Sequence, residues 1–305
     1  MKTSNKQSII FWGTPDFAVP SLKSLHELGL IKAVVTQADK PAGRGKKLLA
    51  SAVKNFCLEN KLVVLEPVKL DQAFIDSLKK YLPATFVVVA YGKIIPQTVL
   101  DLSVRPAVNI HPSMLPQLRG PSPIQTAILN GLESTGVSLM QLDKKMDHGP
   151  ILSQIEVKIE PNEDYPSLAK RLSELGAKML TTNIESYLAG ELSPLAQDDS
   201  QATYCELIEK TAGQIDWSKS AQEINNQIRA FNPWPSAYAQ LSGLDIKFFQ
   251  ARLAAKDLSP GKILLDKENL YIGTAKGSLE ILELQVAGKK KMKTAEFIRG
   301  YQSLL

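Results

Sequence analysis

The chain has 305 residues, of which 44% are hydrophobic and 22% charged, and its formal net charge is +5. These values are typical of a soluble globular protein that is long enough for two domains, each with its own core. The two cysteines lie far apart, which excludes a disulfide framework and a cysteine zinc site. Neither a secretory signal nor an apolar run of the ~20 residues needed for a membrane span is found. We therefore expect a cytoplasmic protein without membrane association. We also expect it to be monomeric.

The first hundred residues alternate between apolar strands and amphipathic helices. Strand–helix–strand units of this length predict right-handed crossovers and a parallel sheet. The first turn, Gly13-Thr-Pro-Asp16, lacks the Gly-x-Gly-x-x-Gly pattern, so we reject a nicotinamide cofactor. The predicted strands are 8–13, 30–36, 62–65 and 85–90, and the predicted helices are 19–28, 51–59, 71–81 and 96–100.

A basic segment follows the second strand. Residues 39–48 contain one acidic residue and two glycines, which give flexibility. They also contain four basic residues: Lys40, Arg44, Lys46 and Lys47. The segment is not a Walker A loop, because Gly45-Lys46 is followed by Lys rather than Ser or Thr. The residues alone favour equally a solvated flexible loop and a mobile basic arm that grips phosphates.

A short strand that ends at Asn109-Ile-His111 is the most informative stretch of the sequence. Residues two apart in a strand point to the same side, so Asn109 and His111 project together. Open parallel sheets place their ligand crevices at the carboxyl ends of the strands. Tyr91-Gly92, at the end of the preceding strand, faces the same crevice. Four prolines between 112 and 123 predict a stiff wall behind it.

The second half of the chain changes character near residue 189. A helix at 124–129, strands at 135–141 and 151–159 and a long helix at 168–188 complete the α/β part. A segment rich in Ser, Asp, Gln and Pro at 189–205 has little to bury and is predicted to be a linker. A helix at 220–230 and several short alternating runs then predict a small β-barrel in 206–305.

Three side chains form a candidate catalytic group. Asn109, His111 and Asp147 can together stabilise an oxyanion and move protons during acyl transfer to an amine. No Ser, Cys or Lys is placed as a nucleophile, which favours direct transfer without a covalent intermediate. Taken singly, each residue has a structural interpretation as a satisfied His, a strand-end Asn or a turn-shaping Asp. A metal site of His111, Asp147 and His148 is a weaker alternative, because the short ligand spacings are missing.

Several of these segments together resemble the tetrahydrofolate-dependent formyltransferase family. The signature runs from Asn109 through the proline-rich loop to Gln125 and continues in Asp147-His-Gly-Pro150. Residues 11–18, 39–48, 87–92 and 231–235 extend the resemblance over nearly the whole chain. Departures from the family pattern are Trp12, Pro112 and Met114, while His148 occupies a variable position of the Asp-x-Gly turn, which argues against a metal role.

The resemblance implies a fold and an activity. The fold is an N-terminal Rossmann-like, mostly parallel sheet flanked by helices in 1–188, a linker at 189–205 and an OB-like β-barrel in 206–305. The activity is metal-free transfer of the formyl group of 10-formyltetrahydrofolate to an amine. Asn109 and His111 would stabilise the oxyanion, and Asp147 would orient His111 and assist proton removal. The implied folate contacts are Val88, Val89, Ala90, Tyr91, Gly92, Ser113, Met114, Leu115, Pro116 and Asp143.

Within the family, the additional segments resemble those members that formylate methionyl-initiator tRNA. The segment around Arg44, with Lys40, Lys46 and Lys47, would then meet the acceptor end of the tRNA. The C-terminal barrel would follow the tRNA backbone with Lys289, Lys290, Lys291 and Lys293. Two alternatives remain open: a family member that acts on an amino sugar or on glycinamide ribonucleotide, and a catalytically silent RNA-binding protein.

Overall fold

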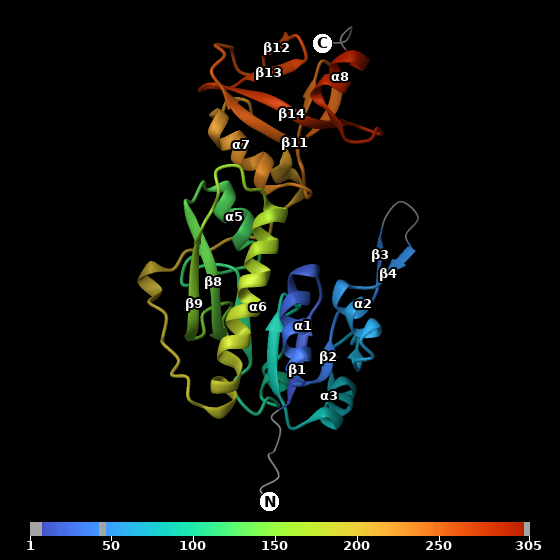
Figure 1. Cartoon of the computed structure of the whole chain (residues 1–305), viewed down its shortest axis with the longest axis vertical. Coiled ribbons are helices and arrows are strands. Elements are labelled where there is room, and N and C mark those ends of the chain that lie inside the picture. Colours follow the sequence, from blue (N-terminus) through green and yellow to red (C-terminus); the bar gives the residue numbers. More distant parts are fainter. Residues whose placement is uncertain (1–7, 43–46, 302–305) are drawn as a thin grey trace, which may run out of the picture. The chain divides into compact units, whose positions relative to one another are not determined.

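The computed structural model describes residues 8–42 and 47–301. Contacts within the chain divide the described residues into two compact units (Figure 1). The first unit holds the residues up to Arg119, together with Gly136–Val157 and Ala169–Tyr204. The second unit holds Gly120–Thr135, Lys158–Leu168 and the residues from Cys205 on. The second unit therefore includes two segments that precede the C-terminal part of the sequence.

A seven-stranded sheet forms the centre of the first unit. Its strands, in spatial order, are β5 (Val64–Leu65), β2 (Ile31–Val35), β1 (Ile9–Gly13), β6 (Thr85–Val89), β7 (Val108–His111), β8 (Ser134–Gln141) and β9 (Ile151–Lys158). The pairs from β5 to β7 are parallel, and β8 runs antiparallel to β7. The predicted Rossmann-like, mostly parallel sheet is confirmed.

Helices cover the sheet, and local sequence explains where two of them begin. Ser51 and Asp71 accept hydrogen bonds from the amides of Lys54 and Phe74, which caps α2 and α3. Figure 1 shows α1 and α6 in front of the strands. The helices of the first unit are α1 (Val19–Glu27), α2 (Ala52–Glu59), α3 (Gln72–Leu78), α4 (Gln97–Leu100) and most of α6 (Tyr165–Ala189), whereas α5 (Pro123–Leu129) belongs to the second unit. Of the helices described, none combines the length and the apolar character that a membrane crossing requires.

Trp12 lies at the centre of the apolar layer between β1 and α3. Its ring is fully buried, and its centroid lies 5.8 Å from that of Phe74, 5.5 Å from that of Phe86 and 5.2 Å from that of Tyr91. The contacts with Phe74 and Tyr91 are edge-to-face, an arrangement that stabilises aromatic clusters beyond the area they bury. The departure from the family pattern at position 12 is thus accommodated by aromatic packing beneath the sheet edge that carries the predicted site.

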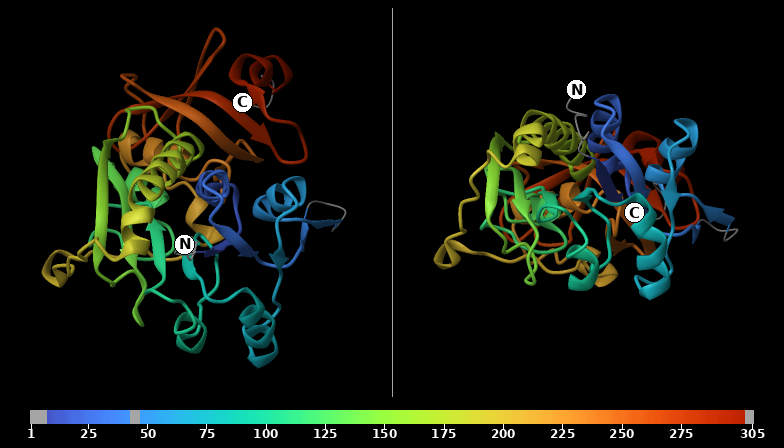
Figure 2. Two further views of the ribbon diagram at one scale, coloured as in Figure 1. Left: turned by 60° about the horizontal axis from the view of Figure 1, so that its bottom comes forward. Right: turned by 90° about the horizontal axis from the view of Figure 1, so that it is seen from below.

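The two ends of the basic segment at 39–48 form regular secondary structure. Two short strands, β3 (Lys40–Ala42) and β4 (Lys47–Leu49), pair antiparallel with Lys40 opposite Leu49. The strands extend away from the sheet, beyond α2 (Figures 1 and 2). The central residues of the segment, 43–46, lie outside the described residues.

The second unit contains an antiparallel sheet in the C-terminal part of the chain, as predicted. Its strands are β10 (Ala237–Leu241), β11 (Leu244–Ala254), β12 (Ile263–Asp266), β13 (Asn269–Gly273), β14 (Ser278–Val286) and β15 (Met292–Lys293). Helix α7 (Ala221–Ala230) begins with a capping box formed by Ser220 and Glu223. Helix α8 (Thr294–Tyr301), which the sequence reading missed, packs against β13 and β14. The small β domain is confirmed, and its likeness to an OB barrel stays a prediction.

Candidate active site

Asn109 and His111 lie on β7, where strand pairing fixes their positions. Asn109 pairs with Val88 of β6 on one side, and His111 pairs with Ser138 of β8 on the other. Asn109 is half-buried, whereas His111 is only 4% exposed. The alternation of a strand directs both side chains to one side of the sheet, as the sequence predicts.

The contacts of the His111 ring define its protonation chemistry. Nε2 lies 3.0 Å from the carbonyl oxygen of Leu118, and Nδ1 lies 3.6 Å from Oδ1 of Asp147. A carbonyl oxygen only accepts hydrogen bonds, so Nε2 carries a hydrogen in either charge state. The exchangeable proton therefore belongs to Nδ1, the nitrogen that faces the carboxylate. Leu118 orients the ring through Nε2, and Asp147 acts on the opposite nitrogen.

The loop after β7 is fixed by side chains from the neighbouring strands. The Ser138 hydroxyl donates to the carbonyl of Ser113 at 2.7 Å and accepts from the amide of Leu115 at 3.1 Å. Gln154 on β9 donates to the carbonyl of Leu115 at 2.9 Å and to the Ser138 hydroxyl at 2.8 Å. The predicted folate contacts at 113–116 thus sit on a backbone that is held in place. Sequence reasoning missed Ser138 and Gln154, which no local motif marks.

A second group of predicted folate contacts, at 88–92, follows β6. The carbonyl of Tyr91 accepts hydrogen bonds from Thr14 at 2.9 Å and from Gln37 at 2.7 Å. Gly92 has a φ of 78°, and a Cβ at this position would lie 2.5 Å from Nε2 of Gln37. Only glycine fits both constraints without strain. Burial raises the pKa of the Tyr91 phenol to about 12, so this side chain is neutral at physiological pH.

His148, next to Asp147, lies between two carboxylates. Its Nδ1 is 2.9 Å from Oδ2 of Asp143, and its Nε2 is 3.1 Å from Oδ2 of Asp199. Hydrogen bonds to Asp143 and then to Asp199 raise the pKa of His148, because only the charged ring donates from both nitrogens. The ring is thus engaged on both sides. Among the described residues, no group of three or more His, Cys, Asp or Glu is arranged to hold a metal ion.

The predicted tRNA contacts are placed only in part. Lys40 is exposed on β3, while Arg44 and Lys46 lie outside the described residues, as does the side chain of Lys47. The four lysines of the C-terminal cluster are exposed around the β14–β15 hairpin: Lys289, Lys290, Lys291 and Lys293. Glu283 lies 2.5 Å from Lys291 and 3.8 Å from Lys293 and offsets part of their charge.

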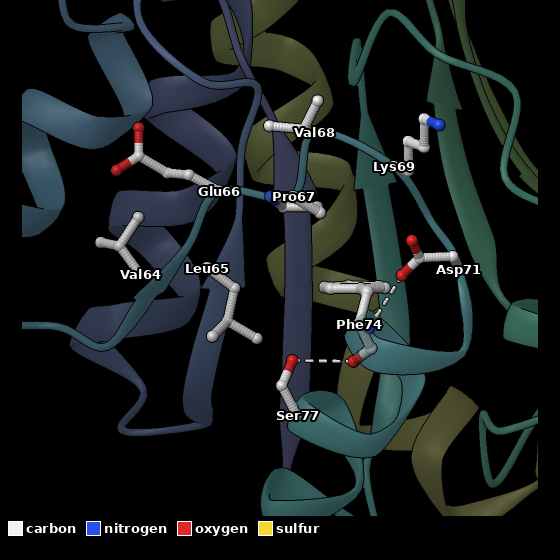
Figure 3. Close-up of a pocket in the computed structure, with 9 residues that line it drawn as sticks. All are labelled: Val64, Leu65, Glu66, Pro67, Val68, Lys69, Asp71, Phe74 and Ser77. Carbon is white, nitrogen blue, oxygen red and sulfur yellow. Dashed lines mark hydrogen bonds between the residues drawn. The ribbon is translucent and has the colours of Figure 1, made fainter.

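A separate hollow of about 470 Å³ lies at the carboxyl end of β5 (Figure 3). It is walled by apolar side chains such as Leu65 and Phe74, and Asp71 caps the helix beside it. Strands β2, β1 and β6 separate β5 from β7 in the sheet. The hollow contains none of the predicted site residues: it is lined by Val64, Leu65, Glu66, Pro67, Val68, Lys69, Asp71, Phe74 and Ser77.

The chain belongs to the formyl transferase family. The family description "Formyl transferase" matches residues 6–184, and "Formyl transferase, C-terminal domain" matches residues 207–302. The predicted catalytic and folate-contact residues, from Val88 to Asp147, fall within the first match. The family predicted from the sequence motifs is thereby confirmed.

Relatives of known name match nearly the whole chain. A protein of Geobacter sulfurreducens named methionyl-tRNA formyltransferase is 40% identical over 297 residues, which are 96% of this chain and 94% of the relative. A protein of the same name from Hydrogenovibrio crunogenus is 42% identical over 305 residues, covering 96% of each. Among solved structures, WlaRD, a sugar 3N-formyl transferase, has a TM-score of 0.71 at 24% identity over 94% of this chain and 100% of its own. This last likeness shows the fold alone.

The pKa of His148 predicts a pH-dependent contribution to stability. Because the folded-state pKa lies above the ordinary value of 6.5, His148 stabilises the fold fully below that value and progressively less as the pH rises through the folded-state pKa. The melting temperature of wild type should exceed that of His148→Gln by more at about pH 6 than at about pH 9. A difference that stays constant or grows with pH would contradict the charged pairing. Measuring the difference between the two proteins removes the contributions of titrating groups that do not interact with His148.

Proposed function

We propose that this protein transfers the formyl group of 10-formyltetrahydrofolate to the α-amine of methionyl-initiator tRNA. The proposal rests on the His111–Asp147 pair beside Asn109, found in a chain whose relatives over nearly full length are named methionyl-tRNA formyltransferase. The matches to both formyl transferase descriptions support the chemistry. The identity of 40–42% to those relatives supports the choice of acceptor.

The reaction begins with attack of the neutral amine on the formyl carbon. A free α-amine has a pKa of about 8, so a useful fraction is neutral at pH 7. A new C–N bond forms, and the carbonyl oxygen becomes an oxyanion. The Asn109 amide donates a hydrogen bond to this oxyanion, and His111 on the same side of β7 adds positive charge once its Nδ1 has taken up the proton that the amine loses.

Proton movement completes the transfer. The attacking nitrogen loses a proton through water to the His111–Asp147 pair, in which Nδ1 is the exchangeable position. The tetrahedral intermediate then collapses, the bond from the formyl carbon to N10 of the folate breaks, and N10 takes up a proton. The products are formyl-methionyl-tRNA and tetrahydrofolate, and no covalent enzyme intermediate is involved.

The identity of the acceptor is tested directly, because the presence of a C-terminal part does not distinguish a tRNA acceptor from a sugar acceptor. WlaRD, named for a sugar, matches 94% of this chain over all of its own length. The fold of nearly the whole chain is therefore shared with a protein named for a sugar acceptor. For the tRNA, we propose contacts from the segment around Arg44 and from the lysine cluster of 289–293.

The first prediction concerns His111. Purified protein should formylate methionyl-initiator tRNA rapidly and methionyl-elongator tRNA slowly, with 10-formyltetrahydrofolate as donor. His111→Ala should lower the rate roughly a hundredfold or more, because it removes both oxyanion support and the exchangeable proton. His26→Ala is the matched control, since His26 packs against Phe56 on α2, away from the candidate site, and this variant should keep its activity. Transfer only to a small amine would overturn the proposed acceptor while leaving the chemistry standing.

The second prediction compares substitutions of the lysines at 289–293 with a substitution of Glu283, the acidic residue that pairs with two of them. Replacing Lys289 and Lys290 by Ala should weaken tRNA binding about tenfold at low salt and flatten its salt dependence, because fewer counterions are released. Glu283→Gln should act in the opposite direction, since it frees Lys291 and Lys293 from their carboxylate partner. Binding measured over a salt series separates the two effects. Equal affinities for all three proteins would remove the cluster from the tRNA interface.

A further inference from the structure

The turn that carries Asp147 is held by a side chain from residues after α6. Gln197 lies 50 positions beyond Asp147 in the sequence, in the segment that connects α6 to the C-terminal part. Its amide nitrogen donates to the backbone carbonyl of Asp147 at 2.9 Å and to that of Gly149 at 2.7 Å. The Gln197 side chain thus fixes the backbone carbonyls on both sides of His148.

A buried arginine determines which way the Gln197 amide points. Arg119, 2% exposed, donates from Nε at 3.0 Å and from Nη2 at 2.8 Å to Oε1 of Gln197. A guanidinium only donates and a carbonyl only accepts, so the oxygen must face Arg119 and the nitrogen must face the turn. Arg119 is itself paired with Asp199 at 2.8 Å. The orientation of the amide is therefore chemically unambiguous.

The turn needs such support because its backbone is constrained. Asp147 has a φ of 51°, in the left-handed region that non-glycine residues adopt at a cost. Gly149 is packed so closely that a Cβ would lie 2.0 Å from the carbonyl oxygen of Gln141. Strained conformations persist where the surrounding structure over-determines them. The conformation held here is the one in which the Asp147 carboxylate lies 3.6 Å from His111.

We propose that Gln197, oriented by Arg119, is a positioning residue for the reaction. It donates both amide hydrogens to the Asp147 turn and thereby holds the carboxylate opposite Nδ1 of His111. This inference rests on the proposed function, because it assigns Gln197 an effect that passes through Asp147.

Gln197→Glu tests the two donated hydrogen bonds specifically. The variant keeps an oxygen for Arg119 but turns the second oxygen, which cannot donate, toward the carbonyls of Asp147 and Gly149. We expect kcat to fall about tenfold or more while KM for the tRNA changes less than about twofold. Gln201→Glu is the matched control: it makes the same charge change four positions later, where the amide donates to Asp198 within its own turn. This control should keep the wild-type kcat.

A double-mutant cycle separates positioning from general stability. In an Asp147→Asn background, Gln197→Glu should lower kcat by less than about twofold further, because both changes act through the same carboxylate. Equal losses in both backgrounds, or an unchanged kcat for Gln197→Glu alone, would overturn the inference. Should Gln197→Glu fold poorly, Gln197→Met removes the same donors without adding charge and carries the same expectation.

Hydrogen–deuterium exchange supplies a readout that does not depend on activity. The peptide covering 143–150 should exchange faster in Gln197→Glu than in wild type and remain unchanged in Gln201→Glu. Unchanged exchange in Gln197→Glu would also overturn the inference. If wild type fails to formylate methionyl-tRNA but the exchange result holds, the proposed function fails and the positioning contact stands.

Discussion

The two-sided pairing of β7 is the constraint on which the site depends. Its parallel partner β6 sets Asn109 opposite Val88, and its antiparallel partner β8 sets His111 opposite Ser138. A slip of one residue in either register would turn both side chains to the other face of the sheet. The same partners build the surroundings, because β6 leads into the segment at 88–92 and Ser138 holds the loop after β7. The register of β7 with its two partners therefore determines the geometry of the site.

Strand geometry alone does not bring the carboxylate to the histidine. Asp147 lies in a turn between β8 and β9, and residues distant in the sequence hold it there. Gln197 and Arg119 fix the turn from one side, while His148 joins it to Asp143 and Asp199. The segment at 189–205 thus contributes structure to the site in addition to connecting two parts of the chain. The polar residues of this segment, which by composition predict only a linker, include Gln197 and Asp199, whose side chains make these contacts.

Local patterns in the sequence predict the sheet and the site residues on it. The continuous apolar runs of β1 and β6 mark strands covered on both faces, and the spacing of Asn109 and His111 follows from the two-residue period of a strand. The contacts of Ser138, Gln154 and Gln197 could not be predicted, because they join residues 16 to 78 positions apart and leave no periodic signal. Helix α8 is different: the apolar spacing of Phe297, Ile298 and Tyr301 was a usable signal.

The most direct test of the account is the single-turnover rate of formyl transfer to methionyl-initiator tRNA by wild type and Asn109→Ala. The substitution removes the amide donor from the strand edge and leaves the His111–Asp147 pair intact. If the oxyanion forms where we place it, the rate constant should fall roughly a hundredfold, with the product still identified by mass as formyl-methionyl-tRNA. A rate within about twofold of wild type would show that Asn109 does not stabilise the oxyanion and would contradict the proposed mechanism.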